Sequence, residues 1–218
     1  MMNFPDHETY RKLYARYYNG RDSEELLRLL KPIKGTNLLD LCGGDGRLTL
    51  NALKKGASRV VLVDAEYEMV PAPLHKNRKI LVLIGTVMSA LLNLHWGLRL
   101  FDRAVCRQGV NYWLNADTLR MLASVLKPQA VFVFNTFNQK PPKEPRVLEY
   151  KMGGHSFAEV SWLIGDKVHH LQVRDGLKHH HTEFKWLSPE EIRKLLERYF
   201  EVEEIQDGKT SLYRCVKF

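Results

Sequence analysis

Residues 38–46 read Leu-Leu-Asp-Leu-Cys-Gly-Gly-Asp-Gly, and residues 60–64 read Val-Val-Leu-Val-Asp. Each stretch is a short apolar run that ends in an acid, and the first contains a glycine-rich turn. With the helix-like segment between them, the two runs are typical of a nucleotide-binding β-loop-α-β unit. Gly44 and Gly46 allow the chain to turn sharply and a ligand to approach bare backbone. Asp64 is placed to accept hydrogen bonds from ribose hydroxyls.

The glycine loop does not fit the dinucleotide-binding fingerprint. That fingerprint requires a third Gly or Ala three residues after the second glycine, where this chain has Thr49. An acid, Asp40, also precedes the loop. The pattern Asp-x-(Gly/Ala/Cys)-x-Gly-x-Gly, formed by Asp40, Cys42, Gly44 and Gly46, resembles motif I of the class I S-adenosylmethionine-dependent methyltransferases.

Three further segments match this family in order and spacing over residues 36–137. They are Val63-Asp64-Ala65 followed by Met69, then Phe101-Asp102-Arg103-Ala104-Val105-Cys106, then Leu126-Lys127-Pro128 before Val131-Phe132-Val133-Phe134. The resemblance implies S-adenosylmethionine as cofactor and a Rossmann-like α/β fold, whose seven-stranded, mostly parallel sheet has helices on both faces. It also implies a set of cofactor-binding residues: Asp40, Leu41, Cys42, Gly43, Gly44, Gly46, Asp64, Ala65, Met69, Val87 and Arg107.

The chain departs from the family after the expected third strand, residues 80–84. The usual acid that touches the adenine amino group is absent, and residues 86–88 read Thr-Val-Met. The helix expected after the second strand is also cut short by Pro71 and Pro73. These departures leave open a non-catalytic relative that binds the cofactor or a partner protein.

The alternation of expected strands and helices predicts a single α/β domain over residues 1–218. Its expected parts are a helical lead-in or cap at 1–35, a cofactor-binding core at 36–137, an antiparallel β insertion after the fifth strand at 147–186, and a C-terminal helix with strands at 187–218. Ser23 and Ser188 are expected N-caps of helices. Residues 80–98 lack charged side chains but divide into a strand and a short helix, so no membrane span is expected.

The composition limits the expected binding partners and the expected cellular location of the protein. Hydrophobic residues make up 44% of the 218 residues, enough for one substantial core. The three cysteines are odd in number and far apart, and no secretory signal is visible, so we expect a reducing, cytoplasmic location. The net charge of +8 permits nucleic-acid binding. Because the basic residues are scattered, a small-molecule acceptor is favoured over RNA, which remains the alternative.

The candidate acceptor residues include the segment after the fourth strand. In the family this position faces the transferable methyl group, and here it carries Asn111 and Tyr112. It lacks the Asn-Pro-Pro-Tyr motif of nucleic-acid amino-methylating enzymes. A helix-start role for Asn111 is an alternative. Tyr17, with Tyr10 and Tyr14, is either an aromatic face for the sulfonium or part of a core.

Six of the nine histidines lie in or beside the expected insertion. Gly165-Asp166 and Asp175-Gly176 each predict a two-residue hairpin turn, so residues 155–186 are expected to form a meander. Counting from the second turn places His170 opposite His181.

Strict alternation gives the meander two unlike faces. The face expected to pack on the domain holds Ala158, Val160, Trp162, Ile164, Leu171, Val173 and Phe184. The polar face holds Glu159, Ser161, His170, Gln172, His179, His181 and Glu183. This polar face is either solvated or the wall of an acceptor pocket, so His170 and His181 are candidates for acceptor binding or a general base. The histidines with Glu183 could converge on zinc, but methyl transfer needs no metal and none is expected.

Overall fold

The computed structural model describes residues 21–95, 99–138, 140–152, 154–207 and 210–218. Contacts divide them into two compact units. The core unit comprises residues 21–138 and 189–218, and the insertion comprises residues 140–188.

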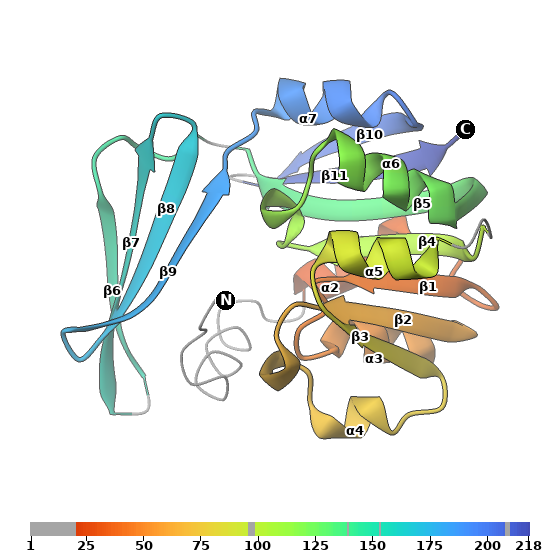
Figure 1. The fold of residues 1–218 in the computed structure, drawn as a ribbon, viewed down its shortest axis with the longest axis horizontal. Helices are drawn as coiled ribbons and strands as arrows, with labels where there is room; N and C mark the ends of the chain where they lie inside the picture. Colours follow the sequence, from red (N-terminus) through yellow and green to blue (C-terminus); the bar gives the residue numbers. More distant parts are fainter. Residues whose placement is uncertain (1–20, 96–98, 139, 153, 208–209) are drawn as a thin grey trace. The chain divides into compact units, whose positions relative to one another are not determined.

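The core unit is built on a seven-stranded sheet with the order β10-β11-β5-β4-β1-β2-β3 (Figure 1). The strands are β1 (Asn37–Leu41), β2 (Arg59–Asp64), β3 (Ile80–Ile84), β4 (Phe101–Arg107), β5 (Leu126–Phe137), β10 (Phe200–Asp207) and β11 (Thr210–Lys217). Neighbouring strands are parallel except that β11 runs antiparallel to both β5 and β10. The expected mostly parallel seven-stranded sheet is therefore confirmed.

The apolar runs predict the central strands well. β1 and β3 coincide with the strands expected at residues 37–41 and 80–84. β4 and β5 are longer than the apolar runs at 104–106 and 131–135, because the sheet ladder continues beyond those runs. Central strands buried on both faces need continuous apolar sequence, and this explains why the apolar runs indicated their positions.

Helices cover both faces of this sheet. α2 (Arg21–Leu29) and α3 (Arg47–Lys54) share a hydrophobic cluster with the sheet. α5 (Val87–Leu94) and α6 (Ala116–Val125) lie on the other face, and α7 (Pro189–Leu196) packs beside α6 (Figure 1). Asn115 caps α6 through a reciprocal capping box with Thr118.

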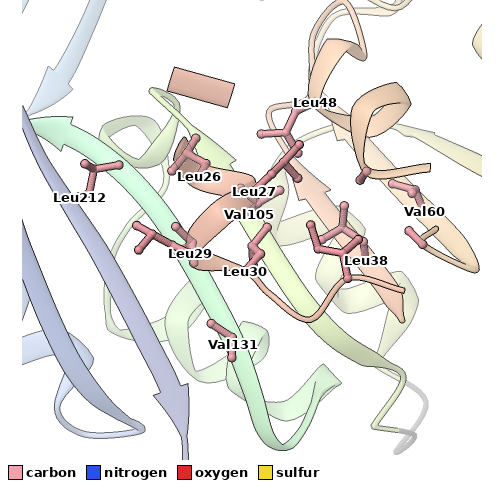
Figure 2. Packing of buried hydrophobic residues seen from close by; sticks show 14 residues of the cluster. Leu26, Leu27, Leu29, Leu30, Leu38, Leu48, Val60, Val105, Val131 and Leu212 are labelled. Atoms are coloured by element: carbon pink, nitrogen blue, oxygen red, sulfur yellow. The ribbon is translucent and has the colours of Figure 1, made fainter. Parts of the chain in front are cut away.

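The cluster under α2 anchors the N-terminal part of the core unit. Leu26, Leu27 and Leu30 are fully buried and point toward Val105 and Val131 of the sheet (Figure 2). Each buried leucine contributes roughly 1.5–3 kcal/mol of transfer free energy. One sequence expectation is corrected here. Ser23 is not an N-cap, because it lies inside α2 with its side chain buried.

Two short elements follow β2, where a proline-terminated helix was expected. η1 (Tyr67–Met69) is a single 3-10 turn, and α4 (Ala72–His75) begins directly after Pro71. Pro73 fits in the first turn of α4 because the first amides of a helix have no intrahelical partner. The prolines therefore also begin a second short helix. No helix among the described residues is long and apolar enough to cross a membrane.

The insertion is a separate four-stranded antiparallel sheet in which neighbours in sequence pair with one another (Figure 1). Its strands are β6 (Arg146–Met152), β7 (His155–Ile164), β8 (Lys167–Arg174) and β9 (Leu177–Lys185). This confirms the expected antiparallel β insertion after β5, and the two hairpin turns lie at residues 165–166 and 175–176 as predicted.

The expected register between β8 and β9 is wrong. The turn at residues 175–176 forms, but His179 of β9 is an extra residue opposite the step between Gln172 and Val173 of β8, which makes a bulge in β9. Gln172 opposes His180 and not His179. A bulge places two residues of one strand against one of its partner, so every later pairing moves by one residue.

This bulge separates the two candidate histidines. His181 opposes Leu171, whereas His170 opposes Thr182. A one-residue slip moves a side chain to the other face of a sheet. His170 and His181 therefore lie on opposite faces, and the predicted common face of histidines does not form.

The burial of the two faces also differs from the prediction. Phe157, Leu163 and Val168 are buried, and the ladder places them on the face of His170. The face expected to be buried contains Ile164, which is 59% exposed. Phe184 opposes Val168 and so belongs to the His170 face instead.

Candidate cofactor site

The polar groups and tight turns of the core unit gather at one edge of its sheet. Because β1 to β5 are parallel, their carboxyl ends meet there, as in other open α/β sheets that bind ligands. This edge carries the loop 42–46, Asp64, the turn at Gly85, residues 107–113, and Asn135 with Thr136.

The glycine loop combines tight packing with one open position. A Cβ at Gly43 would meet Leu62 Cγ at 2.6 Å, and a Cβ at Gly46 would clash with Leu74. Gly44 has φ 51°, and among the described residues its Cβ would meet only Met69 Cε, at 3.8 Å. Gly43 and Gly46 are therefore required for packing, whereas Gly44 leaves bare backbone open to a ligand.

Asp64 lies beside this open position. Its Oδ2 accepts a hydrogen bond from the Gly44 amide at 2.8 Å, and its Oδ1 accepts one from the Glu66 amide at 3.0 Å. The two backbone bonds fix the plane of the half-buried carboxylate. Because each carboxylate oxygen can accept more than one hydrogen bond, this orientation suits a ligand with paired hydroxyls.

Asp40 occupies the interior below the loop. The Thr49 hydroxyl donates to Asp40 Oδ2 at 2.6 Å, which joins β1 to α3. Burial raises the pKa of Asp40 to about 7, while the Thr49 hydrogen bond and the charge of Arg107 act in the opposite direction. Asp40 therefore supports the loop from inside. Leu41 is likewise fully buried, so it presents only backbone to the edge.

The segment after β4 is held by buried polar residues. Asn135 Oδ1 accepts a hydrogen bond from the Gln108 amide at 2.8 Å, where Gln108 has φ 58°. Thr136 Oγ1 donates to Asn111 Oδ1 at 2.8 Å. Asn111 lies inside η2 (Val110–Tyr112), whose N-cap is Gly109, so the alternative helix-start role for Asn111 is excluded.

Sequence reasoning missed three residues of this edge: Ser23, Asn135 and Thr136. Arg107 Nη1 donates to the buried Ser23 hydroxyl at 3.3 Å. Asn135 and Thr136 are each only 4% exposed. A usable signal was present, because both polar residues directly follow the apolar run of β5 at its carboxyl end.

Apolar side chains border the other part of the edge. Met69 and Val87 are buried, whereas Ala65 is exposed. Thr86, at the position of the missing acid, caps α5 by accepting a hydrogen bond from the Ser89 amide at 3.1 Å. The position after β3 therefore ends a turn and begins a helix without presenting a carboxylate.

The remaining described candidates belong to the insertion. His170, in the insertion, has Nδ1 2.8 Å from Ser161 Oγ, and burial lowers its pKa although Glu159 opposes the shift. His181 is exposed, with Nε2 3.3 Å from His169 Nδ1.

Tyr17, together with Tyr10 and Tyr14, lies outside the described residues. No group of three potential metal ligands occurs among the residues that the structure describes.

Comparison with known proteins identifies the family to which this chain belongs. The sequence matches the family model described as a methyltransferase domain over residues 14–204. No curated protein sequence matches the chain.

Among solved structures, an S-adenosylmethionine-dependent methyltransferase from Clostridium acetobutylicum ATCC 824 is 19% identical with a TM-score of 0.69, covering 97% of this chain and 98% of that chain. The amino pentose methyltransferase CalS10 from Micromonospora echinaspora, solved with S-adenosylmethionine bound, is 16% identical with a TM-score of 0.66, covering 94% and 97%. The sugar N-methyltransferase KedS8 from Streptoalloteichus sp. ATCC 53650 is 18% identical with a TM-score of 0.65, covering 94% and 92%.

At these identities the solved structures show that the fold is shared. The family model adds more, because it matches most of the chain, from before α2 into β10. This chain therefore belongs to the methyltransferase domain family, and it is an S-adenosylmethionine-dependent methyltransferase.

Proposed function

We propose that this enzyme transfers a methyl group to a small-molecule acceptor at the carboxyl edge of the core unit, and that both units form one catalytic domain. The observation that carries the proposal is the open backbone at Gly44 beside the oriented Asp64 carboxylate. Both features suit an adenosyl group, since a ribose offers paired hydroxyls and close approach requires backbone without a side chain.

In this proposal each predicted cofactor residue has a distinct role. Asp64 accepts hydrogen bonds from the ribose hydroxyls, and the backbone of Leu41, Cys42, Gly43 and Gly44 lines the cofactor. The glycines at 43 and 46 and the buried Asp40 keep that loop in shape.

Further residues would border the cofactor's two ends. Ala65, Met69 and Val87 provide the apolar surroundings of the adenine. Arg107, whose charge opposes the rise that burial causes in the pKa of Asp40, supplies a positive charge for the amino-acid end.

The chemistry requires mainly alignment. When bound, S-adenosylmethionine would supply an electrophilic methyl group on its sulfonium, with the neutral thioether S-adenosylhomocysteine as the leaving group. The protein contributes by holding the acceptor in line with that methyl group and excluding water, which supplies on the order of 7 kcal/mol in favourable cases. Asn111, oriented by Thr136, is the candidate in the core unit for binding the acceptor.

Two of the similar solved structures suggest a class of acceptor for this enzyme. CalS10 and KedS8 are covered almost completely by this chain and carry the descriptions amino pentose and sugar N-methyltransferase. Amino sugars are therefore the first acceptors to test. In the insertion, His170 and His181 remain candidates for acceptor binding or proton removal. Because they lie on opposite faces of the sheet, only one of them would face a given acceptor.

Calorimetric titration with S-adenosylhomocysteine tests the cofactor site directly. We expect binding by the wild type and by the variant Glu68→Ala, a change to an exposed acid of η1, but weaker binding by Asp64→Ala. Transfer of labelled methyl groups to a panel of amino sugars and other small amines then tests the acceptor. Folded protein that does not bind S-adenosylhomocysteine contradicts the site assignment.

RNA is the second candidate acceptor, favoured only by the net charge of +8. RNA binding by this route releases counterions, so its affinity must fall steeply as the salt concentration rises. A filter-binding titration with structured RNA at two salt concentrations distinguishes the two acceptors. Salt-dependent binding followed by methylation of the RNA would replace the small-molecule proposal.

A further inference from the structure

Two of the three free thiols meet beneath the proposed cofactor loop. Cys42 is half-buried at the start of the loop, and Cys106 is fully buried in β4. Cys42 Sγ donates a hydrogen bond to the Gly109 carbonyl, just after β4, at 3.9 Å. A Cβ placed on Gly109 would lie 2.6 Å from Cys42 Sγ and 3.3 Å from Cys106 Sγ, so both sulfurs touch the same backbone position.

The backbone brings these cysteines within range of a covalent bond. Leu41 pairs with Cys106 in the parallel ladder, and Cys42 is the next residue. Adjacent strands lie about 4.8 Å apart and rise about 3.3 Å per residue, so Cα atoms one residue out of register are about 6 Å apart. Disulfides join Cα atoms separated by about 4.4–6.8 Å. The left-handed φ of 57° at Cys42 accompanies the turn that keeps its side chain against β4.

We propose that Cys42 and Cys106 form a reversible disulfide whose formation prevents cofactor binding. This inference rests on the proposed function, because that proposal assigns the loop beginning at Cys42 to the cofactor.

The oxidant would be a peroxide or a small-molecule disulfide. With peroxide, the Cys42 thiolate attacks one oxygen, the O–O bond breaks, and a sulfenic acid and water form after proton uptake. The Cys106 sulfur then attacks the sulfenic sulfur, which forms the S–S bond and releases a second water. With a small disulfide, two exchange steps release two small thiols.

The surroundings of Cys42 determine how quickly this happens. The neighbouring Cys106 thiol and burial both raise the pKa of Cys42. Since the thiolate is the reactive species, the reaction is slow at neutral pH and faster at higher pH. Such a pair responds to sustained oxidation and not to brief exposure.

The disulfide would distort the loop because the sulfurs must approach to about 2.05 Å. Cys42 Sγ then moves toward β4, on the side where Gly109 is already in close contact. That displacement passes to Gly43 and Gly44, whose amides bond Val63 and Asp64. Coupling between the bond and the ligand is reciprocal, so bound ligand must disfavour the disulfide by the same factor.

The test uses the full chain, treated with hydrogen peroxide or oxidised glutathione at pH 7.5 and 9. Remaining thiols are alkylated, and peptides are mapped by mass spectrometry. We expect a Cys42–Cys106 linked peptide, faster at pH 9, with alkylated Cys215 and reversal by dithiothreitol. Affinity for S-adenosylhomocysteine, measured calorimetrically, should fall by about tenfold or more. Added S-adenosylhomocysteine should slow formation of the linked peptide.

The variants Cys106→Ser and Cys106→Ala should prevent the link and make ligand affinity insensitive to oxidant. Cys215→Ser is the matched control, because Cys215 is a buried thiol of β11, and it should retain both effects. Absence of the linked peptide from folded protein overturns the proposal, as does a link that leaves affinity unchanged. If the reduced protein does not bind S-adenosylhomocysteine, the proposed cofactor site is wrong. The peptide map then still shows whether Cys42 and Cys106 form a disulfide.

Discussion

The central strands of the core unit and the strands of the insertion distribute their polar side chains differently. Leu38, Leu39 and Leu41 of β1 are fully buried, and Asp64 of β2 and Asn135 of β5 form hydrogen bonds at the carboxyl edge. In β7, β8 and β9, polar residues are spread along the strands, and Ser161 contacts His170 in the middle of the sheet. A ligand site in the core unit is therefore confined to one edge. In the insertion, the register decides which side chains share a surface.

The largest expected effect tests whether the edge of the core unit is the ligand site. Gly44→Val should abolish S-adenosylhomocysteine binding, because the side chain fills the open position near Met69. The matched control is Gly165→Val in the insertion, where φ is 63° and a Cβ would meet no described atom within 4 Å. Both variants impose similar backbone strain, roughly 1–2 kcal/mol or more. Calorimetry should show binding only in the control, and equal binding by both contradicts the assignment.

The next prediction tests which face of the insertion is buried. Phe157→Ala should cost about 3–5 kcal/mol of local stability, since Phe157 is 3% exposed. Ile164→Ala, at a position 59% exposed on the other face, should cost less than about 0.5 kcal/mol. Hydrogen exchange of the β7 and β8 amides measures both. A larger loss of stability from Ile164→Ala than from Phe157→Ala would show that the face containing Ile164 is buried, as strict alternation predicted.

Asp40 provides a pH test of the core unit. Its folded pKa is raised from 3.8 to about 7, so between these values the folded protein holds a proton that the unfolded chain has released. Stability therefore falls as pH rises from about 4 to about 7, by up to about 4 kcal/mol, and this contribution is level above that range.

Asp40→Asn should remove this slope, whereas Asp45→Asn, in the loop that follows β1, should keep it. Urea unfolding at pH 5 and pH 8 makes the comparison. Parallel pH profiles for the wild type and Asp40→Asn would show that Asp40 is ionised throughout.

A smaller effect is expected at Asp64. Asp64→Ala should weaken S-adenosylhomocysteine binding by about 1–3 kcal/mol, the cost of leaving hydrogen-bonding groups without their partner. Part of this loss arises because the Gly44 amide loses its acceptor. Asp64→Asn keeps an oxygen acceptor and should lose less. Calorimetric affinities of the two variants that coincide with the wild type would remove Asp64 from the site.

The smallest expected effect separates the two histidines. His170→Ala loses the contact with Ser161 and should cost about 1 kcal/mol of stability. His181→Ala, at an exposed position, should cost less than about 0.5 kcal/mol. Turnover is measured separately from cofactor binding in each variant. Equal effects of both substitutions would contradict the opposite-face arrangement.

The two regions also differ in how far the sequence predicts them. In the core unit, apolar runs ending at Asp40, Asp64 and Gly85 place the strands and the edge, because each signal is local. The capping box that begins α6 is also local, because Asn115 and Thr118 are three residues apart. The partners of Ser23, Asn135 and Thr136 come from distant segments, so no local pattern reveals their hydrogen bonds.

In the insertion, the turns were local and predictable, but the bulge at His179 was not. No glycine or proline stands in β9 to mark it. A single unpaired residue was enough to separate His170 from His181 and to invert the assignment of Phe184. Alternation in sequence therefore determines faces only as far as the ladder remains regular.

The place of β11 has a consequence for the order of folding. β11 lies between β5 and β10 in the sheet, although the whole insertion and α7 separate it from β5 along the chain. The hairpins of the insertion close short loops, whereas the β5–β11 ladder must close a long one, and such non-local pairings form slowly. Until β11 docks, β5 remains an open edge with unpaired backbone groups, which is where a folding intermediate of this chain is exposed to aggregation.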